Sequence, residues 1–299
     1  MWTAPPPSQS TLADSYKSRY REARHEILSD EHLAYKDARA VAQRAFILAH
    51  TSPSLIDRRR LLDIGCAAGS LLRSLGEQWP NGELVGFEPD LRMAAAARAR
   101  LPARAVVHDV VFESSKVDNE GFDLITASHI LEHVPNPVVF LSDLWNSTRP
   151  GGLLFLEVPH ETTSSVKEIV KARHRGLMHL LFFSMPSLGD CVRQAGWDTL
   201  YMSTFGPDVA SFSIVPTRYA SWPKRLRFAA SRIKRRFRRQ LGLYEADSNS
   251  VDWVAAYSRE SAKSGIWIRL VAERSAAGNE GDAVADDASR PGPRLEGSR

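Results

Sequence analysis

Short apolar runs alternate with amphipathic stretches between residues 60 and 205, and this alternation limits the chain to few architectures. The apolar runs read RLLDIGC, ELVGFEP, ARAVVHDV, FDLITASH and LLFLEVP, and helical patterns such as SLLRSLGEQW and DLRMAAAARARL lie between them. Short strands that alternate with helices form βαβ units, whose parallel strands are covered by helices on both faces. The sequence therefore predicts an α/β fold with a mostly parallel sheet.

Two further apolar runs extend this sheet towards the C-terminus. DTLYMSTF follows a predicted helix in SMPSLGDCVRQAGW, and GIWIRLVAER, at residues 265–274, is expected to pair with it as the closing strand. A helical insertion at residues 206–264 separates the two runs. We therefore assign the core to residues 55–205 plus the closing strand. We expect residues 15–54 to form helices, and one role for these helices is a lid over the ligand site.

The composition fits a globular protein of a reducing compartment. The chain has 299 residues, a net charge of only +4 and two cysteines, Cys66 and Cys191, which lack a metal-binding spacing. We expect Cys66 to be a small buried filler rather than a nucleophile. The N-terminus lacks the basic and apolar regions of a signal peptide, and the chain has no apolar run of about 18 residues, so we expect a cytoplasmic protein. The sequence shows no tight cluster of Asp, His and Cys, so we expect no resident metal. Residues 1–14 and 275–299 are expected to be disordered.

The run LLDIGCAAGS, at residues 61–70, carries the clearest functional signal. An apolar strand that enters a glycine-rich turn and then a helix is typical of nucleotide binding. The turn lacks the middle glycine that admits a pyrophosphate and lacks a P-loop lysine, which favours an adenosine ligand without a diphosphate. Glu88 ends the next strand, where a carboxylate would bind ribose hydroxyls, and Asp109 ends the third strand, where it could accept from an adenine amino group.

These motifs, together with FDLITASHILEHV, resemble the motif series of class I S-adenosylmethionine-dependent methyltransferases over residues 55–205. The resemblance implies a Rossmann-like seven-stranded sheet with S-adenosylmethionine as cofactor and S-adenosylhomocysteine as product. It also implies that the glycines of the turn make room for the methionine part and that residues 127–129 line the sulfonium. The expected cofactor-binding residues are Asp63, Gly65, Cys66, Gly69, Glu88, Pro89, Asp109, Val110, Ala127, Ser128 and His129.

Two longer phrases narrow the resemblance. HILEHVPNP and HLLFFSMPSLGDCVRQAGW are similar to a subgroup near the ubiquinone-pathway O-methyltransferases and to methyltransferases found with surface-polysaccharide genes. This similarity favours O-methylation of a glycan, a glycolipid or another small hydroxylated metabolite. The chain lacks the Asn/Asp-Pro-Pro-aromatic motif of base N-methylation, a Pro-Cys nucleophile and an N-terminal zinc-binding cysteine cluster. An RNA methyltransferase and a catalytically silent scaffold remain the alternatives.

An alcohol acceptor must lose a proton as the new bond forms, and a histidine suits that task. We predict a catalytic set of His133, His160, His179 and Glu132, with His133 and His160 equally favoured as the base. His129 is a further candidate, because it flanks Glu132 just after the fourth predicted strand. A purely structural role is the alternative for His133, which could cap or pack the turn before Pro135.

A basic segment lies inside the insertion. Residues 217–242 contain ten lysines and arginines and no acid, and Pro223 suits the first turn of a helix over residues 222–241. Trp222, Ile233 and Phe237 belong to one apolar stripe of that helix. A basic amphipathic helix favours an anionic membrane surface as partner, here the inner face of the membrane, and a lipid-linked glycan would then suit as acceptor. RNA is a less favoured partner, and a helix packed on the domain is the structural alternative.

Overall fold

The computed structural model describes residues 28–51, 60–118, 120–160, 179–208, 253–258, 260–261 and 265–275. The strands are β1 (Arg60–Ile64), β2 (Glu83–Phe87), β3 (Ala105–His108), β4 (Phe122–Ser128), β5 (Thr148–Pro159), β6 (Asp198–Asp208), β7 (Glu260–Ser261) and β8 (Gly265–Glu273). The helices are α3 (Asp30–Ala49), α4 (Ser70–Gly76), α5 (Leu91–Arg100), α6 (Pro137–Asn146), α8 (Met185–Gln194) and α12 (Trp253–Ser258), with 3-10 turns η3 (Ser114–Lys116) and η4 (Leu131–His133). The predictions for residues 1–14, 222–241 and 276–299 lie outside the described residues.

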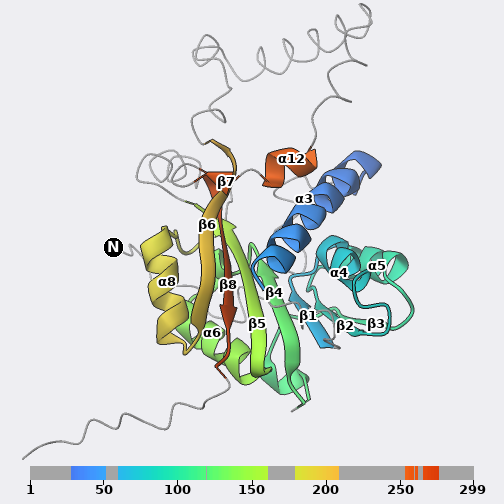
Figure 1. The fold of residues 1–299 in the computed structure, drawn as a ribbon. Helices are drawn as coiled ribbons and strands as arrows, with labels where there is room; N and C mark the ends of the chain where they lie inside the picture. Colours follow the sequence, from blue (N-terminus) through green and yellow to red (C-terminus); the bar gives the residue numbers. More distant parts are fainter. Residues whose placement is uncertain are drawn as a thin grey trace, which may run out of the picture.

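The strands form one sheet in the order β3-β2-β1-β4-β5-β8-β6-β7 (Figure 1). Strands β1 to β5 are parallel to one another, and β8 runs antiparallel between β5 and β6. This arrangement confirms the predicted seven-stranded, mostly parallel sheet and the pairing of the closing strand with the strand before the insertion. The structure adds an eighth strand, β7, whose two residues pair with Thr204 and Phe205 of β6.

Strand β5 begins earlier than predicted. The sequence predicts that Pro150 and two glycines separate a helix from a strand that starts at Leu153, but β5 already pairs with β4 at Thr148. The register shifts between Phe122 and Leu124, so the segment after Thr148 bulges out of the sheet. Gly151 supports the bulge with a φ of +72°, and its N–H donates to the carbonyl of Arg274. A proline and two glycines thus mark a bulge as well as the end of a helix.

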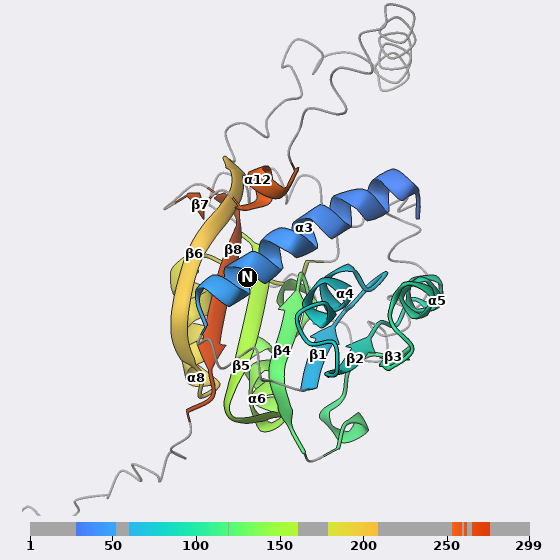
Figure 2. The same cartoon turned by 45° about the vertical axis from the view of Figure 1, so that its right-hand side comes forward.

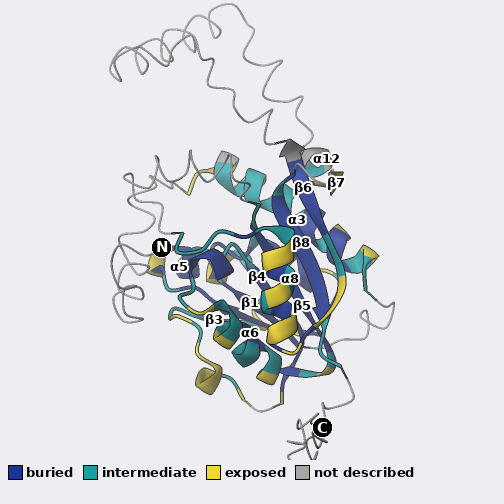
Figure 3. Cartoon of the chain, turned by 90° about the vertical axis from the view of Figure 1, so that its left-hand side faces the viewer, coloured by how far each residue is buried: buried dark blue, intermediate teal, exposed yellow. Residues whose placement is uncertain are grey.

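Helices cover both faces of the sheet, and each face has its own apolar core. Leu141 of α6 and Leu188 of α8 belong to the core on one face, while Phe46 of α3 and Leu72 of α4 belong to the core on the other. Figure 2 shows α3 and α4 in front of the sheet, and Figure 3 shows α8 on the opposite face with exposed outer turns over buried strands. Burial on both sides explains why the strands read as continuous apolar runs.

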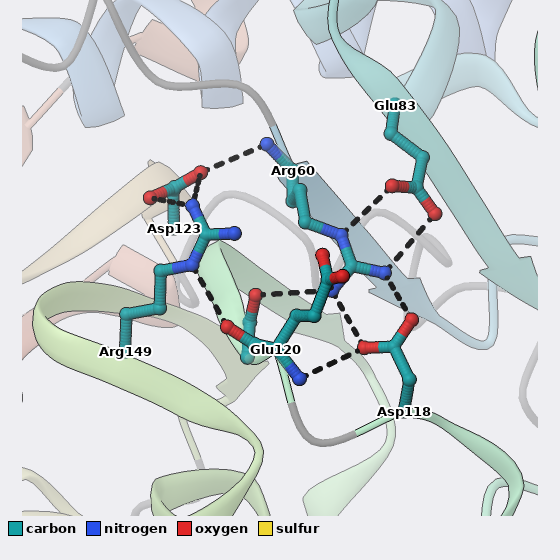
Figure 4. Close-up of polar contacts among 7 residues, drawn as sticks. Arg60, Glu83, Asp118, Glu120, Asp123 and Arg149 are labelled. Carbon is teal, nitrogen blue, oxygen red and sulfur yellow. Dashed lines mark hydrogen bonds and ion pairs between the residues drawn. The ribbon is translucent and has the colours of Figure 1, made fainter.

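Ion pairs fix the amino end of β1 (Figure 4). The buried guanidinium of Arg60 donates to Glu83 of β2 and to Asp118, with distances of 2.7 to 3.1 Å. The backbone N–H of Arg60 also donates to Asp123 of β4, whose carboxylate in turn accepts from Arg149. These contacts join three neighbouring strands at one edge of the sheet, so the glycine-rich turn after β1 lies at the opposite, carboxyl edge.

Helix α3 crosses that carboxyl edge beside α4 and α12 (Figures 1 and 2). It begins at Ser29, whose side chain accepts from the N–H of His32 as an N-cap. Asp37 ties it to the neighbouring helices through Arg73 of α4 and Arg100 of α5, at 2.7 and 2.6 Å. The helix is therefore held over the edge where open α/β sheets bind their ligands. Among the described residues, no helix is both long and apolar enough to cross a membrane.

Candidate active site

A cavity of about 600 Å³ lies between α3 and the carboxyl ends of β1, β2, β3 and β4. Its volume suits a small-molecule ligand, and its place matches the point where the chain order of the sheet reverses between β1 and β4. Nine predicted site residues line it, namely Asp63, Gly65, Cys66, Glu88, Pro89, Val110, Ser128, His129 and His133. The wall also contains residues that the sequence did not single out, among them Tyr35, Lys36, Arg39 and Gln43 of α3, Phe112, and Trp267 of β8.

The glycine-rich turn bends the chain directly under the cavity. The N–H groups of Gly65 and Cys66 donate to the carbonyl of Phe87, at 2.8 and 3.1 Å, so the turn leans towards β2. Gly65 has a φ of +72°, and a side chain there would collide with Ile130. Gly69 has a φ of +77° and starts α4, but it does not line the cavity. Gly65 therefore keeps this part of the cavity free of a side chain, whereas Gly69 allows the left-handed backbone conformation that precedes α4.

Glu88 is held rigidly at the end of β2. Its side chain is buried, with 3% exposed. One carboxylate oxygen accepts from the N–H of Ala67 and the other from the N–H of Asp90, each at 2.9 Å. The carboxylate is thereby fixed in the wall of the cavity, and a carboxylate oxygen is a suitable acceptor for the hydroxyls of a ligand diol. Glu88 therefore fits the role predicted for it toward a ribose.

Asp63 is buried from solvent, close enough to Glu88 for the two charges to interact. It is 3% exposed and accepts from Oγ1 of Thr126 at 2.7 Å. Burial raises the pKa of Asp63 to about 7, the hydrogen bond from Thr126 opposes that rise, and the negative charge of Glu88 adds to it. Asp63 thus changes its protonation state near neutral pH at the wall of the cavity.

His129 sits between two buried carboxylates where β4 ends. Its backbone has a φ of +58°, which is uncommon for a residue with a side chain, and its N–H donates to the carbonyl of Glu157 at 2.7 Å. Its ring atom Nδ1 lies 3.2 Å from Oε1 of Glu132, and Nε2 lies 3.5 Å from Oε1 of Glu157. The ring of His129 is therefore held in the cavity wall by two carboxylates, at a residue whose backbone conformation is uncommon.

Glu157 of β5 connects this ring to α3 and β8. Its fully buried carboxylate accepts from Arg39 and Gln43 of α3 and, at 2.5 Å, from Nε of Arg269. Burial alone would raise the pKa of Glu157, but Arg39, Arg269 and His129 hold it well below its ordinary value. We call Arg39, Gln43, Glu157 and Arg269 the Glu157 network. Its members are far apart in the sequence, and no local pattern marks them.

Six predicted site residues do not line the cavity, namely Gly69, Asp109, Ala127, Glu132, His160 and His179. Asp109 is half exposed, and its carboxylate pairs with Arg98 at 3.2 Å rather than facing the cavity. Nδ1 of His160 lies 2.9 Å from the carbonyl of Gly265, so the ring is engaged with β8. Of the predicted catalytic set, the structure therefore brings His133 to the cavity. Glu132 and His179 lie close to His133, just behind the wall.

Comparison with known proteins identifies the family of the chain. A family model described as a methyltransferase domain matches residues 20–201. The chain is 27% identical over 131 residues to a trans-aconitate 2-methyltransferase of Rhodopseudomonas palustris, a match that covers 44% of this chain and 49% of the relative. It is also 27% identical over 171 residues to a ubiquinone biosynthesis O-methyltransferase of Methylococcus capsulatus, which covers 54% and 71%. The chain spans about half the length of most of the curated relatives it matches.

Solved structures share the fold. A methyltransferase of Thermotoga maritima superposes with a TM-score of 0.52 at 16% identity, covering 88% of this chain and 99% of that one. The magnesium protoporphyrin IX methyltransferase of Synechocystis, solved with bound S-adenosylhomocysteine, superposes with a TM-score of 0.50 at 12% identity, covering 89% and 99%. At these identities the likeness concerns the fold alone.

Proposed function

Because the chain belongs to the family of S-adenosylmethionine-dependent methyltransferases, we propose that it transfers a methyl group from S-adenosylmethionine to an oxygen atom of a glycan, a glycolipid or another small hydroxylated metabolite. Glu88 carries this proposal. It is buried at the end of β2, lines the cavity, and is held in place by two backbone N–H groups. Such a carboxylate suits the ribose hydroxyls of the donor.

The donor brings an activated methyl group on a sulfonium, so the protein mainly supplies proximity and alignment. Gly65 leaves the turn free of a side chain next to Ile130, which keeps space for the methionine part. His129 and Ser128 end β4 in the cavity wall, on the side expected for the reacting methyl group. The acceptor then has the remaining wall, to which α3 contributes Tyr35 and Lys36.

An oxygen acceptor fits the groups that face this second part of the cavity. The ammonium of Lys36 is a hydrogen-bond donor, and Tyr35 and Trp267 add aromatic rings to the wall. Arg39 also lines the wall, but its guanidinium donates to Glu157 and lies 5.2 Å from the centre of the Trp267 ring. We infer that His133 assists the removal of the acceptor proton, because it is the member of the predicted catalytic set that lines the cavity. One matched relative is named as an O-methyltransferase, which supports oxygen as the target.

The first test is calorimetric titration of the full chain with S-adenosylhomocysteine. We expect Glu88→Ala to weaken binding about 100-fold or more, since it removes two hydrogen bonds to a charged group worth about 1.5–3 kcal/mol each. Asp109→Ala is the matched control. Its carboxylate pairs with Arg98 outside the cavity, so we expect its affinity to stay within about threefold of the wild type.

The outcomes separate the rival functions. Unchanged affinity in Glu88→Ala would remove the basis of the donor site. Donor binding without labelled methyl transfer to any glycan, lipid-linked or small hydroxylated acceptor would favour a silent scaffold. Methyl transfer to RNA instead of these acceptors would favour the RNA methyltransferase.

A further inference from the structure

Three side chains that can bind a metal converge behind His129. Glu132 and His133 come from the short turn η4, and His179 comes from the segment before α8. A carboxylate oxygen and one ring nitrogen from each histidine all lie within 4.8 Å of one another. Residues separated by more than forty positions in the sequence therefore present three ligand atoms to one small volume.

Backbone contacts hold the two segments together. The N–H groups of Leu180 and Leu181 both donate to the carbonyl of Glu132, at 2.7 and 3.1 Å. The rings of His133 and His179 lie 4.9 Å apart and are nearly perpendicular, at 83°. Main-chain hydrogen bonds therefore hold the segment that carries His179 against η4. The two imidazole rings lie next to these hydrogen bonds.

The carboxylate of Glu132 is buried beside the imidazole rings of His129 and His133. The residue is 1% exposed, and although burial alone would raise the pKa of its carboxyl group, the charges of His129 and His133 lower it. The nearest ring nitrogens, Nδ1 of His129 and Nε2 of His133, lie 3.2 and 3.9 Å from Oε1. A buried carboxylate is costly unless it is paired, hydrogen-bonded or bound to a metal. Glu132 is therefore a charged carboxylate that also faces the ligand atoms of His133 and His179, and this convergence suits a cation.

We propose that Glu132, His133 and His179 bind one divalent transition-metal ion, although the sequence alone predicts no resident metal. Two imidazoles and one carboxylate form the donor set of many zinc enzymes and of other first-row metal sites, which keep at least one position open. A zinc ion about 2.1 Å from each ligand places tetrahedral ligand atoms about 3.4 Å apart. The farthest pair, now within 4.8 Å, therefore approaches by up to about 1.4 Å when the ion binds.

The location gives the ion a role in the reaction, and this part rests on the proposed function. His133 is both a proposed ligand and a residue of the cavity wall, so the ion would lie against the part of the wall that His133 forms. A bound cation polarises a coordinated hydroxyl oxygen and lowers the pKa of that hydroxyl. His133 would then assist by holding the ion, and the acidified hydroxyl would release its proton to water. Binding of the ion itself does not depend on the identity of the acceptor.

The test is calorimetric titration of the chelator-treated full chain with zinc chloride, without donor or acceptor. We expect one zinc ion per chain with a Kd below about 1 µM, and a loss of affinity of about 100-fold or more in His179→Ala and in Glu132→Gln. His160→Ala is the matched control, since it also removes a histidine but lies outside the cluster, and it should bind zinc as the wild type does. Circular dichroism confirms that each variant is folded.

Two results would overturn the proposal. One is a folded wild-type chain that takes up no zinc. The other is a His179→Ala variant that binds zinc as tightly as the wild type, which would assign the uptake to adventitious histidines. Because S-adenosylhomocysteine binding is measured separately with Glu88→Ala, failure of the metal site and failure of the donor site can be distinguished.

Discussion

At the donor end of the cavity, Asp63, Gly65 and Glu88 come from two neighbouring parallel strands and the turn between strand and helix. At the α3 end, Arg39, Glu157 and Arg269 come from a helix near the start of the chain, a central strand and the last strand. The donor end is thus built from local sequence, and the α3 end is assembled by the completed fold. A glycine-rich turn and the strand ends beside it can be formed by residues that are close in the sequence. A network of long charged side chains forms only when distant segments of the chain have come together.

Electrostatics separates the two ends further. Asp63 and Glu157 are both fully or almost fully buried, yet the pKa of Asp63 is raised to about 7 and that of Glu157 is held well below its ordinary value. The difference lies in the partners. Asp63 has the hydroxyl of Thr126 and the like charge of Glu88, while Glu157 has two guanidinium groups. Burial alone therefore does not set the charge of a carboxylate at this site.

The largest expected effect concerns the α3 end. We expect Glu157→Ala to lower the free energy of unfolding by about 3–5 kcal/mol, because it leaves the fully buried Arg269 and the nearby Arg39 without their carboxylate. Chemical denaturation followed by circular dichroism measures this change. Glu77→Ala is the matched control, since Glu77 pairs with Arg44 of α3 but is largely exposed, and it should cost less than about 1 kcal/mol. Similar losses in both variants would show that the Glu157 network is no stronger than a surface ion pair.

This contrast also explains how far the sequence could predict the molecule. The mostly parallel sheet, its closing strand and the residues that follow β1, β2 and β4 could be predicted because each leaves a short-range pattern. Glu157 was visible only as one polar residue in the apolar run LLFLEVP, and nothing nearby indicated that Arg39 and Arg269 would meet it. Strand β7 was missed because two residues carry no periodicity.

The acceptor side shows the same limit. The four histidines named as candidates all follow or precede core elements, and the sequence treats His133 and His160 alike. Their difference comes from tertiary contacts, because β8 engages His160 through Gly265 while His133 faces the cavity. Asp109 likewise ends a strand as predicted, but Arg98 of α5 draws its carboxylate aside. A side chain's position at a strand end is predictable, and its direction depends on neighbours from elsewhere in the fold.

The next effect tests the donor end through pH. The pKa of Asp63 is raised to about 7 in the folded chain from an ordinary value near 3.8, so between these pH values the native state holds a proton that the unfolded state releases. The free energy of unfolding should therefore fall as pH rises from about 4 to about 7, by roughly 2–4 kcal/mol relative to Asp63→Asn, which has no such proton. Unfolding of both proteins by urea at pH 4, 5.5 and 7.5 measures this difference. Equal pH dependence in the two proteins would mean that Asp63 is ionised throughout, as Glu157 is expected to be.

The smallest expected effect separates two glycines of one turn. Gly65 and Gly69 both have a positive φ, so alanine at either position should cost about 1–2 kcal/mol of stability. Only the side chain at position 65 would enter the cavity next to Ile130, whereas at position 69 it would meet Leu101 of the apolar core at 3.1 Å. We therefore expect Gly65→Ala to weaken S-adenosylhomocysteine binding about tenfold, and Gly69→Ala to leave it within about threefold, in the same calorimetric titration.

An equal loss of affinity in both glycine variants would contradict the role given to Gly65 alone. It would mean that the backbone path of the whole turn, and not the bare surface at Gly65, positions the donor. The donor end would then resemble the α3 end more closely, since its binding surface would depend on the cooperative fit of the turn with the core around Leu101. A loss confined to Gly65→Ala would instead show that one missing side chain makes the space.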